Sequence, residues 1–143
     1  MNNENKTAVY IGSFDPFHNG HLEVISLALH YVNRIIIIVS TNKNKIQTPI
    51  LIRYQMVKYL FHDSPNIDVT IDLEKYLLPT NIGIIGSDII KPPKWNPEQW
   101  IIVERPDYPI IDLPNWITNK PIIIKQRSIL SSTYIRSEIQ ASA

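Results

Sequence analysis

The feature that most constrains the fold of this 143-residue chain is a strand–turn–helix pattern near its N-terminus. The apolar run AVYI at residues 8–11 leads into the sequence GSFDPFHNGH at residues 12–21, and a helical pattern over residues 22–32 follows. A strand, a turn and a helix are therefore predicted in direct succession. Free backbone N–H groups at the start of such a helix can hold an anion, and His18 and His21 add donors there. We interpret the turn as a phosphate-binding loop.

The helix after this loop is predicted from about Gly20 to Asn33. Its apolar stripe consists of Leu22, Ile25, Leu29 and Val32. Polar side chains occupy the opposite face, so we expect the stripe to be buried against a sheet.

Strands and helices continue to alternate further along the chain. Residues 34–40 (RIIIIVS) are apolar without alternation, as in a central parallel strand that is covered on both faces. A helix is predicted over about residues 49–62, and a closing helix from about Ser131. The further strands are predicted over residues 66–72, 82–85, 100–103 and 122–125. This order predicts an α/β fold, a Rossmann-like doubly wound parallel sheet whose loop sites meet at one edge.

Prolines concentrate in the second half of the chain. Seven of the eleven prolines lie between Pro92 and Pro121, and proline interrupts helices. We therefore expect loops rather than long helices there, forming a proline-rich rim over about residues 91–121. No internal repeat or linker is visible, so residues 1–143 are predicted to form a single compact domain.

The charge balance and the absence of cysteine exclude several classes of function. Fourteen basic and thirteen acidic residues leave a net charge of +1, which gives no broad footprint for nucleic acid or membrane. The chain has no cysteine, which excludes disulfides, thiolate catalysis and cysteine-ligated zinc. Residues 1–7 are polar and lack the apolar stretch of a signal peptide. We expect a cytoplasmic protein.

The glycines narrow the kind of phosphate site. Only four occur, at positions 12, 20, 83 and 86, so neither a G-x-G-x-x-G fingerprint nor a Walker P-loop can be written. The phosphate-binding loop at residues 12–21 must therefore be of another type.

Two separated motifs resemble one superfamily. His18-Asn19-Gly20-His21 has the form of the HxGH signature, and the whole run at residues 12–21 resembles the nucleotidyltransferase superfamily of adenylyl- and cytidylyltransferases. Residues 131–136 (SSTYIR) resemble the SSTxxR element that opens the last helix of this superfamily. The SST form is more similar to the branches that use ATP.

This resemblance implies adenylyl transfer, in which a substrate phosphate attacks the α-phosphorus of Mg-ATP and pyrophosphate leaves. No enzyme nucleophile is needed, and Mg²⁺ is implied by the triphosphate rather than by any cluster of metal ligands. His18, His21 and Arg136 are the catalytic residues that the resemblance implies. The implied ATP-binding residues are Gly12, Ser13, Phe14, His18, His21, Ser131, Ser132, Thr133 and Arg136.

The chain resembles two branches of this superfamily, which differ in the phosphate acceptor that they use. The first third of the chain is similar to phosphopantetheine adenylyltransferase, although that enzyme typically has threonine where His18 stands. From Asp72 onward the chain resembles nicotinate or nicotinamide mononucleotide adenylyltransferase, and Arg53 with Met56 fits the R-x-x-M helix of that branch. Residues 86–95 resemble its G-x-D…W element and residues 103–108 its V-x-R-P-G-Y element, so we favour the pyridine mononucleotides. The predicted acceptor-binding residues are Lys43, Lys45, Asp88, Trp95 and Arg105.

The acceptor region departs from the family pattern. The helix that usually precedes the G-x-D element is reduced to residues 75–80, and Asp107 replaces the usual glycine. The acceptor pocket is then open, completed by another subunit in a homo-oligomer, or reshaped for a different phosphate. A non-catalytic ATP- or dinucleotide-binding regulatory domain is the alternative from another class. Both motif histidines are present, which favours turnover.

Overall fold

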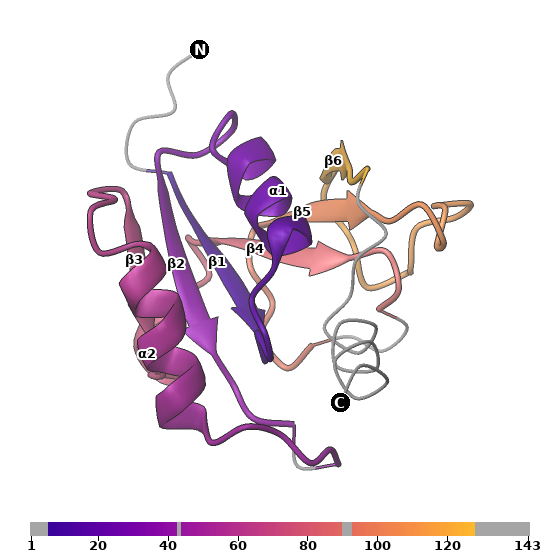
Figure 1. Ribbon diagram of the computed structural model, residues 1–143. Coiled ribbons are helices and arrows are strands. Elements are labelled where there is room, and N and C mark those ends of the chain that lie inside the picture. Colours follow the sequence, from indigo (N-terminus) through magenta and orange to yellow (C-terminus); the bar gives the residue numbers. More distant parts are fainter. Residues whose placement is uncertain (1–5, 43, 90–92, 128–143) are drawn as a thin grey trace.

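The computed structural model describes residues 6–42, 44–89 and 93–127 (Figure 1). Within these ranges strands and helices alternate up to residue 86, and loops join the last three strands, as predicted. The short helix at residues 73–76 was not predicted. The elements are β1 (Thr7–Gly12), α1 (Asn19–Ala28), β2 (Arg34–Val39), α2 (Ile50–Leu60), β3 (Ile67–Thr70), α3 (Leu73–Tyr76), β4 (Ile82–Gly86), β5 (Gln99–Glu104) and β6 (Ile122–Lys125). None of these helices has the length and hydrophobicity that a bilayer-spanning segment requires.

The strands form one six-stranded sheet in the order β3-β2-β1-β4-β5-β6. Every neighbouring pair is parallel, and Tyr10 of β1 lies between Ile37 of β2 and Ile84 of β4. The chain runs outward from β1 in both directions, so the order reverses between β1 and β4. Ligands of such sheets bind beyond the carboxyl ends of the strands at this switch point. The Rossmann-like doubly wound fold is confirmed.

The two faces of the sheet are covered differently. Figure 1 shows α1 and α2 on one face, where their residues Val24, Ile25, Ala28 and Val57 belong to the largest buried cluster. On the opposite face, smaller clusters form on β1 and β2 and on β4 and β5. This second face is covered by Tyr76 of α3 and by the loop side chains Leu77, Trp95, Ile110, Trp116 and Ile117. In the described part of the predicted proline-rich rim, residues 93–121, β5 forms and no helix does.

The first helix is shorter than predicted. It ends at Ala28 rather than at Asn33, because the N–H groups of His30 and Tyr31 donate to carbonyls three residues back, at 3.2 and 2.9 Å, and tighten the chain into a turn. The Asn33 N–H then donates to the Lys6 carbonyl at 3.1 Å, which returns the chain to the sheet.

The buried stripe of α1 also differs from the predicted one. Leu22 is 44% exposed, whereas Gly20, Val24, Ile25 and Ala28 are buried. Gly20, Val24 and Ala28 are spaced by four residues, so they share one side of the helix. That side faces the sheet because the first turn of α1 is held by side chains around Gly20, as described below.

Candidate active site

The two motif histidines cap the first helix reciprocally. His18 is the N-cap of α1, and its Nδ1 accepts a hydrogen bond of 3.0 Å from the Gly20 N–H. The His18 N–H in turn donates to Nδ1 of His21 at 3.1 Å. The two rings stack with their centroids 3.8 Å apart. Because each Nδ1 is an acceptor, each neutral ring carries its proton on Nε2 and keeps that N–H free to donate elsewhere.

Both rings are held in the neutral form. Burial and, after it, the neighbouring His18 and Arg105 together lower the pKa of His21 to about 3. Burial also lowers the pKa of His18, again with help from Arg105. The pair therefore offers two fixed N–H donors near neutral pH without adding charge, and Arg105 supplies a cation beside them.

The loop before α1 depends on one glycine. Phe14 adopts a positive φ of 49°, and its buried ring folds back against the end of β1. A Cβ at Gly12 would lie 2.9 Å from the Phe14 ring, so only glycine fits there without a shift. The Phe14 ring also packs edge-on against the His21 ring, with the ring centroids 5.0 Å apart. The Phe17 ring lies with its centroid 5.1 Å from that of His21. These aromatic rings fix the orientation of the His21 imidazole.

Arg53 of α2 fastens the same loop. It is 2% exposed, and its guanidinium donates to the carbonyls of Ser13 (2.8 Å), Ser40 (2.7 Å) and Thr48 (2.6 Å). The C=O of Ser13 and the N–H of Phe14 lie in one peptide plane and point in opposite directions. The bond to Arg53 therefore turns the Phe14 N–H away from α2. The sequence assigned Arg53 only to a family pattern and did not identify this positioning role.

The histidines line a small polar cavity of about 130 Å³ at the carboxyl edge of the sheet. Asp88 and Arg105, both predicted to bind the acceptor, lie in the lining of the same cavity. A Cβ at Gly86 would lie 2.5 Å from Asp88 Oδ1, so glycine lets this carboxylate rest against the backbone. The complete lining is Tyr10, His18, His21, Val24, Gly86, Asp88, Val103, Arg105 and Gln126.

Ser87 holds the backbone that carries Arg105. Its hydroxyl accepts from the Arg105 N–H at 3.0 Å and donates to the Tyr108 carbonyl at 2.6 Å. The guanidinium itself has one weak contact, Nε to Asp107 Oδ1 at 3.5 Å, and Nε makes no hydrogen bond within the described residues. The backbone of Arg105 is thus fixed while its charged group remains available to an anion.

Gln126 ties the last strand to the first helix, and the sequence did not reveal it. Its buried Nε2 donates to the Gly20 carbonyl at 3.1 Å. A Cβ at Gly20 would lie 2.8 Å from His18 Cε1 and 2.9 Å from Gln126 Nε2, which accounts for glycine in the motif. One signal was available: Gln126 directly follows the last predicted strand, and parallel strands end at one edge.

The remaining predicted site residues do not join this cavity in the described structure. Lys45 is exposed and is not in its lining. The indole Nε1–H of Trp95 donates to the Leu78 carbonyl at 3.1 Å, and its ring packs edge-on against Trp100 with the ring centroids 5.7 Å apart. The roles assigned to both residues stay predictions. Lys43, Ser131, Ser132, Thr133 and Arg136 lie outside the described residues.

The fold and this cavity define a Rossmann-like protein with two neutral histidines and an arginine in one polar cavity at the start of its first helix. The chain belongs to the cytidylyltransferase-like family, whose model matches residues 9–139. The resemblance drawn from the two sequence motifs is therefore confirmed.

Curated relatives include phosphopantetheine adenylyltransferases. That of Mycoplasma mycoides subsp. mycoides SC is 41% identical over 87 residues, which make up 60% of this chain and 62% of that protein. That of Francisella tularensis subsp. novicida is 42% identical over 67 residues, or 46% of this chain and 41% of that protein. The match thus spans from two fifths to just over three fifths of the length of these two relatives.

Solved structures with a similar fold include a nicotinic acid mononucleotide adenylyltransferase. Plasmodium falciparum nicotinic acid mononucleotide adenylyltransferase complexed with NaAD matches 92% of this chain and 82% of its own, with a TM-score of 0.68 and 19% identity. The same enzyme complexed with APC matches with a TM-score of 0.67 and 18% identity. At this level of identity the similarity confirms the fold.

Proposed function

We propose that this protein is an adenylyltransferase that moves AMP from Mg-ATP to a phosphate monoester and releases pyrophosphate. The observation that carries the proposal is the reciprocal cap, which leaves the Nε2–H groups of His18 and His21 as paired donors beside Arg105 in one cavity. Membership of the cytidylyltransferase-like family supports it. Relatives and structural neighbours that are adenylyltransferases support it further.

The proposed reaction is an in-line displacement. An oxygen of the acceptor phosphate forms a bond to the α-phosphorus. The bond between that phosphorus and the oxygen that bridges it to the β-phosphorus breaks. The electron pair leaves with pyrophosphate, accompanied by the Mg²⁺ that enters as part of the ATP substrate. The protein has to position the reactants and stabilise charge on the phosphoryl oxygens, so it needs no nucleophile of its own.

The chain's own residues have distinct parts in this scheme. His18 and His21 donate hydrogen bonds from Nε2–H to the ATP phosphates, and backbone N–H groups near Ser13 and Phe14 donate hydrogen bonds to the α-phosphate. The resemblance to the SSTxxR element supports the assignment of Ser131, Ser132, Thr133 and Arg136 to the β- and γ-phosphates. The residues that we assign to the acceptor are Lys43, Lys45, Asp88, Trp95 and Arg105.

Nicotinate or nicotinamide mononucleotide is the acceptor that we favour, on the resemblance of the second half of the chain. Phosphopantetheine is the second candidate, because the relatives named above transfer AMP to that acceptor. A regulatory domain that binds ATP without turnover is the alternative from another class. We expect the reaction to take place in the cytoplasm, and assembly into a homo-oligomer remains a prediction.

The test is pyrophosphate release by the full chain from Mg-ATP. Nicotinamide mononucleotide, nicotinate mononucleotide and phosphopantetheine are added in separate reactions, and ATP binding is measured in parallel by calorimetry. We expect release with at least one acceptor and none without an acceptor. ATP binding without release in all three reactions would overturn the enzymatic proposal in favour of a regulatory domain.

A further inference from the structure

The outward side of α2 is apolar. Ile52, Met56, Tyr59 and Leu60 are between 48 and 73% exposed. They are spaced i, i+4, i+7 and i+8, which is the spacing by which a helix ordinarily turns its apolar side to the core. We call these four residues the α2 stripe. Single exposed apolar side chains are common on protein surfaces, whereas a contiguous set of them marks a surface that contacts another molecule.

The α2 stripe cannot turn inward, because another side of the helix already faces the sheet. Val57 is fully buried on that side, and α2 packs against β2 and β3. Arg53 is buried as well, and its bonds to three backbone carbonyls fix the rotation of the helix. The exposure of the stripe is therefore a consequence of how α2 is anchored.

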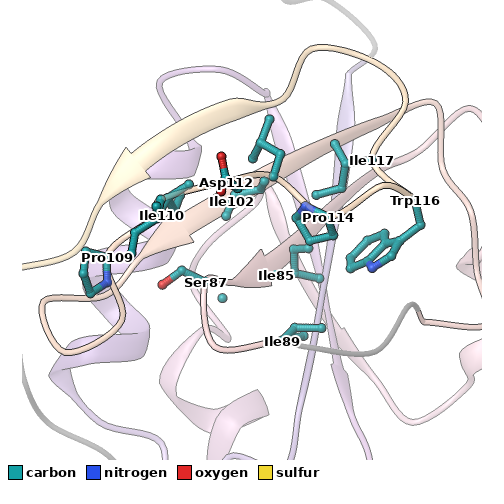
Figure 2. Close-up of a pocket in the computed structure, with 13 residues that line it drawn as sticks. Ile85, Ser87, Ile89, Ile102, Pro109, Ile110, Asp112, Pro114, Trp116 and Ile117 are labelled. Atoms are coloured by element: carbon teal, nitrogen blue, oxygen red, sulfur yellow. The ribbon is translucent and has the colours of Figure 1, made fainter.

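The chain covers the apolar surface of β4 and β5 by itself. Figure 2 shows the segment from Pro109 to Ile117 running over Ile85 of β4 and Ile102 of β5, with a cavity of about 570 Å³ beneath it. Among residues 6–42, 44–89 and 93–127, no segment covers the α2 stripe in this way. The stripe is thus the apolar surface that is left for a partner.

A groove of about 710 Å³ lies beside the stripe. All four stripe residues contribute to its lining, and Pro16 and Phe17 contribute to it from the loop before α1. The surface thus combines a ridge of apolar side chains with a groove along the same helix. Helices pack against one another by placing the ridges of one in the grooves of the other. A second α2 helix fits this surface, because each ridge can enter the groove of the other copy.

The charge pattern favours a second copy of this chain as the partner. In a two-fold interface the same surface faces itself, so a surface without ionised groups avoids like charges opposite each other. The stripe consists of one tyrosine and three aliphatic side chains, none of which is charged near neutral pH. Helices that lie on membranes instead carry many lysines and arginines on their polar side, and Lys58 is the one exposed basic residue of α2.

The exposed area suits a small dimer. A fully buried aromatic side chain removes about 150–250 Å² from water, so four side chains that are about half exposed present roughly 400 Å². The wall of the groove beside Pro16 and Phe17 adds to this area. A standard interface takes about 800 Å² from each partner. The stripe and the groove together therefore approach the area of a stable dimer.

We propose that two copies of this chain form a two-fold dimer through their α2 stripes. The two α2 helices run antiparallel, so that the N-terminus of each lies beside the C-terminus of the other and their dipoles attract. Met56, in the middle of the stripe, lies close to its counterpart at the two-fold axis. The stripe contains none of the residues that we assign to ATP or to the acceptor, so this inference does not rest on the proposed reaction.

The first test measures the mass of the full chain by sedimentation velocity over a range of protein concentrations. We expect a dimer, with twice the 16.5 kDa of one chain. Met56→Glu places two carboxylates at the axis and should weaken the dimer about 100-fold, because like charges that face each other across an interface are strongly disfavoured. Met56 is exposed in the single chain, so the circular dichroism of the variant should stay that of the folded protein.

Ile111→Glu is the matched control for this test. It adds the same charge at an apolar side chain that is 86% exposed, in the loop over β4 and β5. This variant should remain as dimeric as the unmodified protein. An unmodified protein that is monomeric at every concentration would overturn the proposal, as would a Met56→Glu variant that dimerises as tightly as the unmodified protein.

The second test uses the absence of cysteine from the chain. Met56→Cys introduces a single thiol, so a short bismaleimide can join only two different copies. We expect a covalent dimer from Met56→Cys and little from Ser26→Cys, whose thiol lies at an exposed position of α1. Equal yields from the two variants would reflect random collision and would overturn the proposal.

A lipid surface is the alternative occupant, and the same variants detect it. If the unmodified protein is monomeric and sediments with phosphatidylcholine vesicles while Met56→Glu does not, the stripe binds membranes and the dimer is refuted. Mass and cross-linking are measured without substrate. Failure of every acceptor to yield pyrophosphate would therefore refute adenylyl transfer and leave the evidence for the dimer intact.

Discussion

His21 is the side chain on which the proposed reaction depends most. Its Nδ1 is occupied by the His18 N–H, so Nε2–H is its one remaining donor. His21→Ala should reduce kcat by about 10²–10³, the loss expected for one preorganised donor, while circular dichroism remains that of the folded protein. His62→Ala removes an exposed histidine in the turn after α2, outside the lining of the cavity, and serves as the control. A His21→Ala variant with a near-normal rate would remove His21 from the mechanism.

The depressed pKa of His21 makes stability depend on pH. The unfolded chain binds a proton at His21 below its ordinary pKa of 6.5, whereas the folded protein does so only near 3. The unfolded state therefore binds more protons between these values, so the stabilisation is complete above pH 6.5 and is lost as the pH falls. The contribution of His21 alone should lower the free energy of unfolding, measured by urea titration, by about 1 kcal/mol for each unit that the pH falls in this range.

His21→Gln should reduce that slope, because glutamine can still accept from the His18 N–H and does not titrate. The range to examine for a histidine is about pH 5 to pH 7. If the free energy of unfolding of His21→Gln and of the unmodified protein changed equally with pH over this range, His21 would titrate normally in the folded state.

Gly20→Ala tests whether packing accounts for the motif glycine. In an ordinary helix this change is stabilising by about 1 kcal/mol. Here the new Cβ would press on the His18 ring and the Gln126 amide, at 2.8 and 2.9 Å. We expect a loss of about 1–3 kcal/mol in the free energy of unfolding and a marked loss of activity. Asn19→Ala, at the exposed neighbouring position, is the control; a more stable Gly20→Ala protein would contradict the packing account.

The helix α2 acts on the active site through Arg53 rather than through contact with the cavity. Arg53→Met would leave the carbonyls of Ser13, Ser40 and Thr48 without this partner. We expect a loss of about 2–4 kcal/mol in the free energy of unfolding, since several buried acceptors lose their bonds together. The KM for ATP should also rise, because the loop backbone is released. Gln55→Met on the exposed side of α2 should change neither quantity.

Arg53→Lys separates charge from geometry. Lysine keeps the positive charge but cannot reproduce the planar fork that reaches three carbonyls. It should therefore recover only part of the stability lost in Arg53→Met. Full recovery of both stability and the KM for ATP would show that the charge alone positions the loop.

The elements differ in how far the sequence could predict them. The start of α1 was predictable, because its cap lies within four adjacent residues, His18 to His21. Its end was not, because the turn at residues 29–33 is set by the bond from Asn33 to Lys6 on the neighbouring chain segment. The strands were predictable from their apolar runs, since both faces of this sheet are covered.

For the whole molecule, the predicted doubly wound sheet brings the histidines of the first loop to the same edge as Asp88 and Arg105, and the structure places them in one cavity. The bonds from Arg53 to Ser13 and from Gln126 to Gly20 join residues 40 and 106 positions apart. Contacts of that separation leave no local pattern. A cavity of about 570 Å³ beneath the loop at residues 109–117 was likewise unpredictable, because it depends on how this loop lies over β4 and β5.

The central claim is that the α-phosphorus of ATP is the atom transferred. The most direct measurement incubates the full chain with the active acceptor and ATP radiolabelled at either the α- or the γ-phosphorus, and separates the products. The account predicts that the α-label appears in the acceptor product and the γ-label in pyrophosphate, in equal amounts. Appearance of the γ-label in the acceptor product or in inorganic phosphate, with no transfer of the α-label, would contradict it.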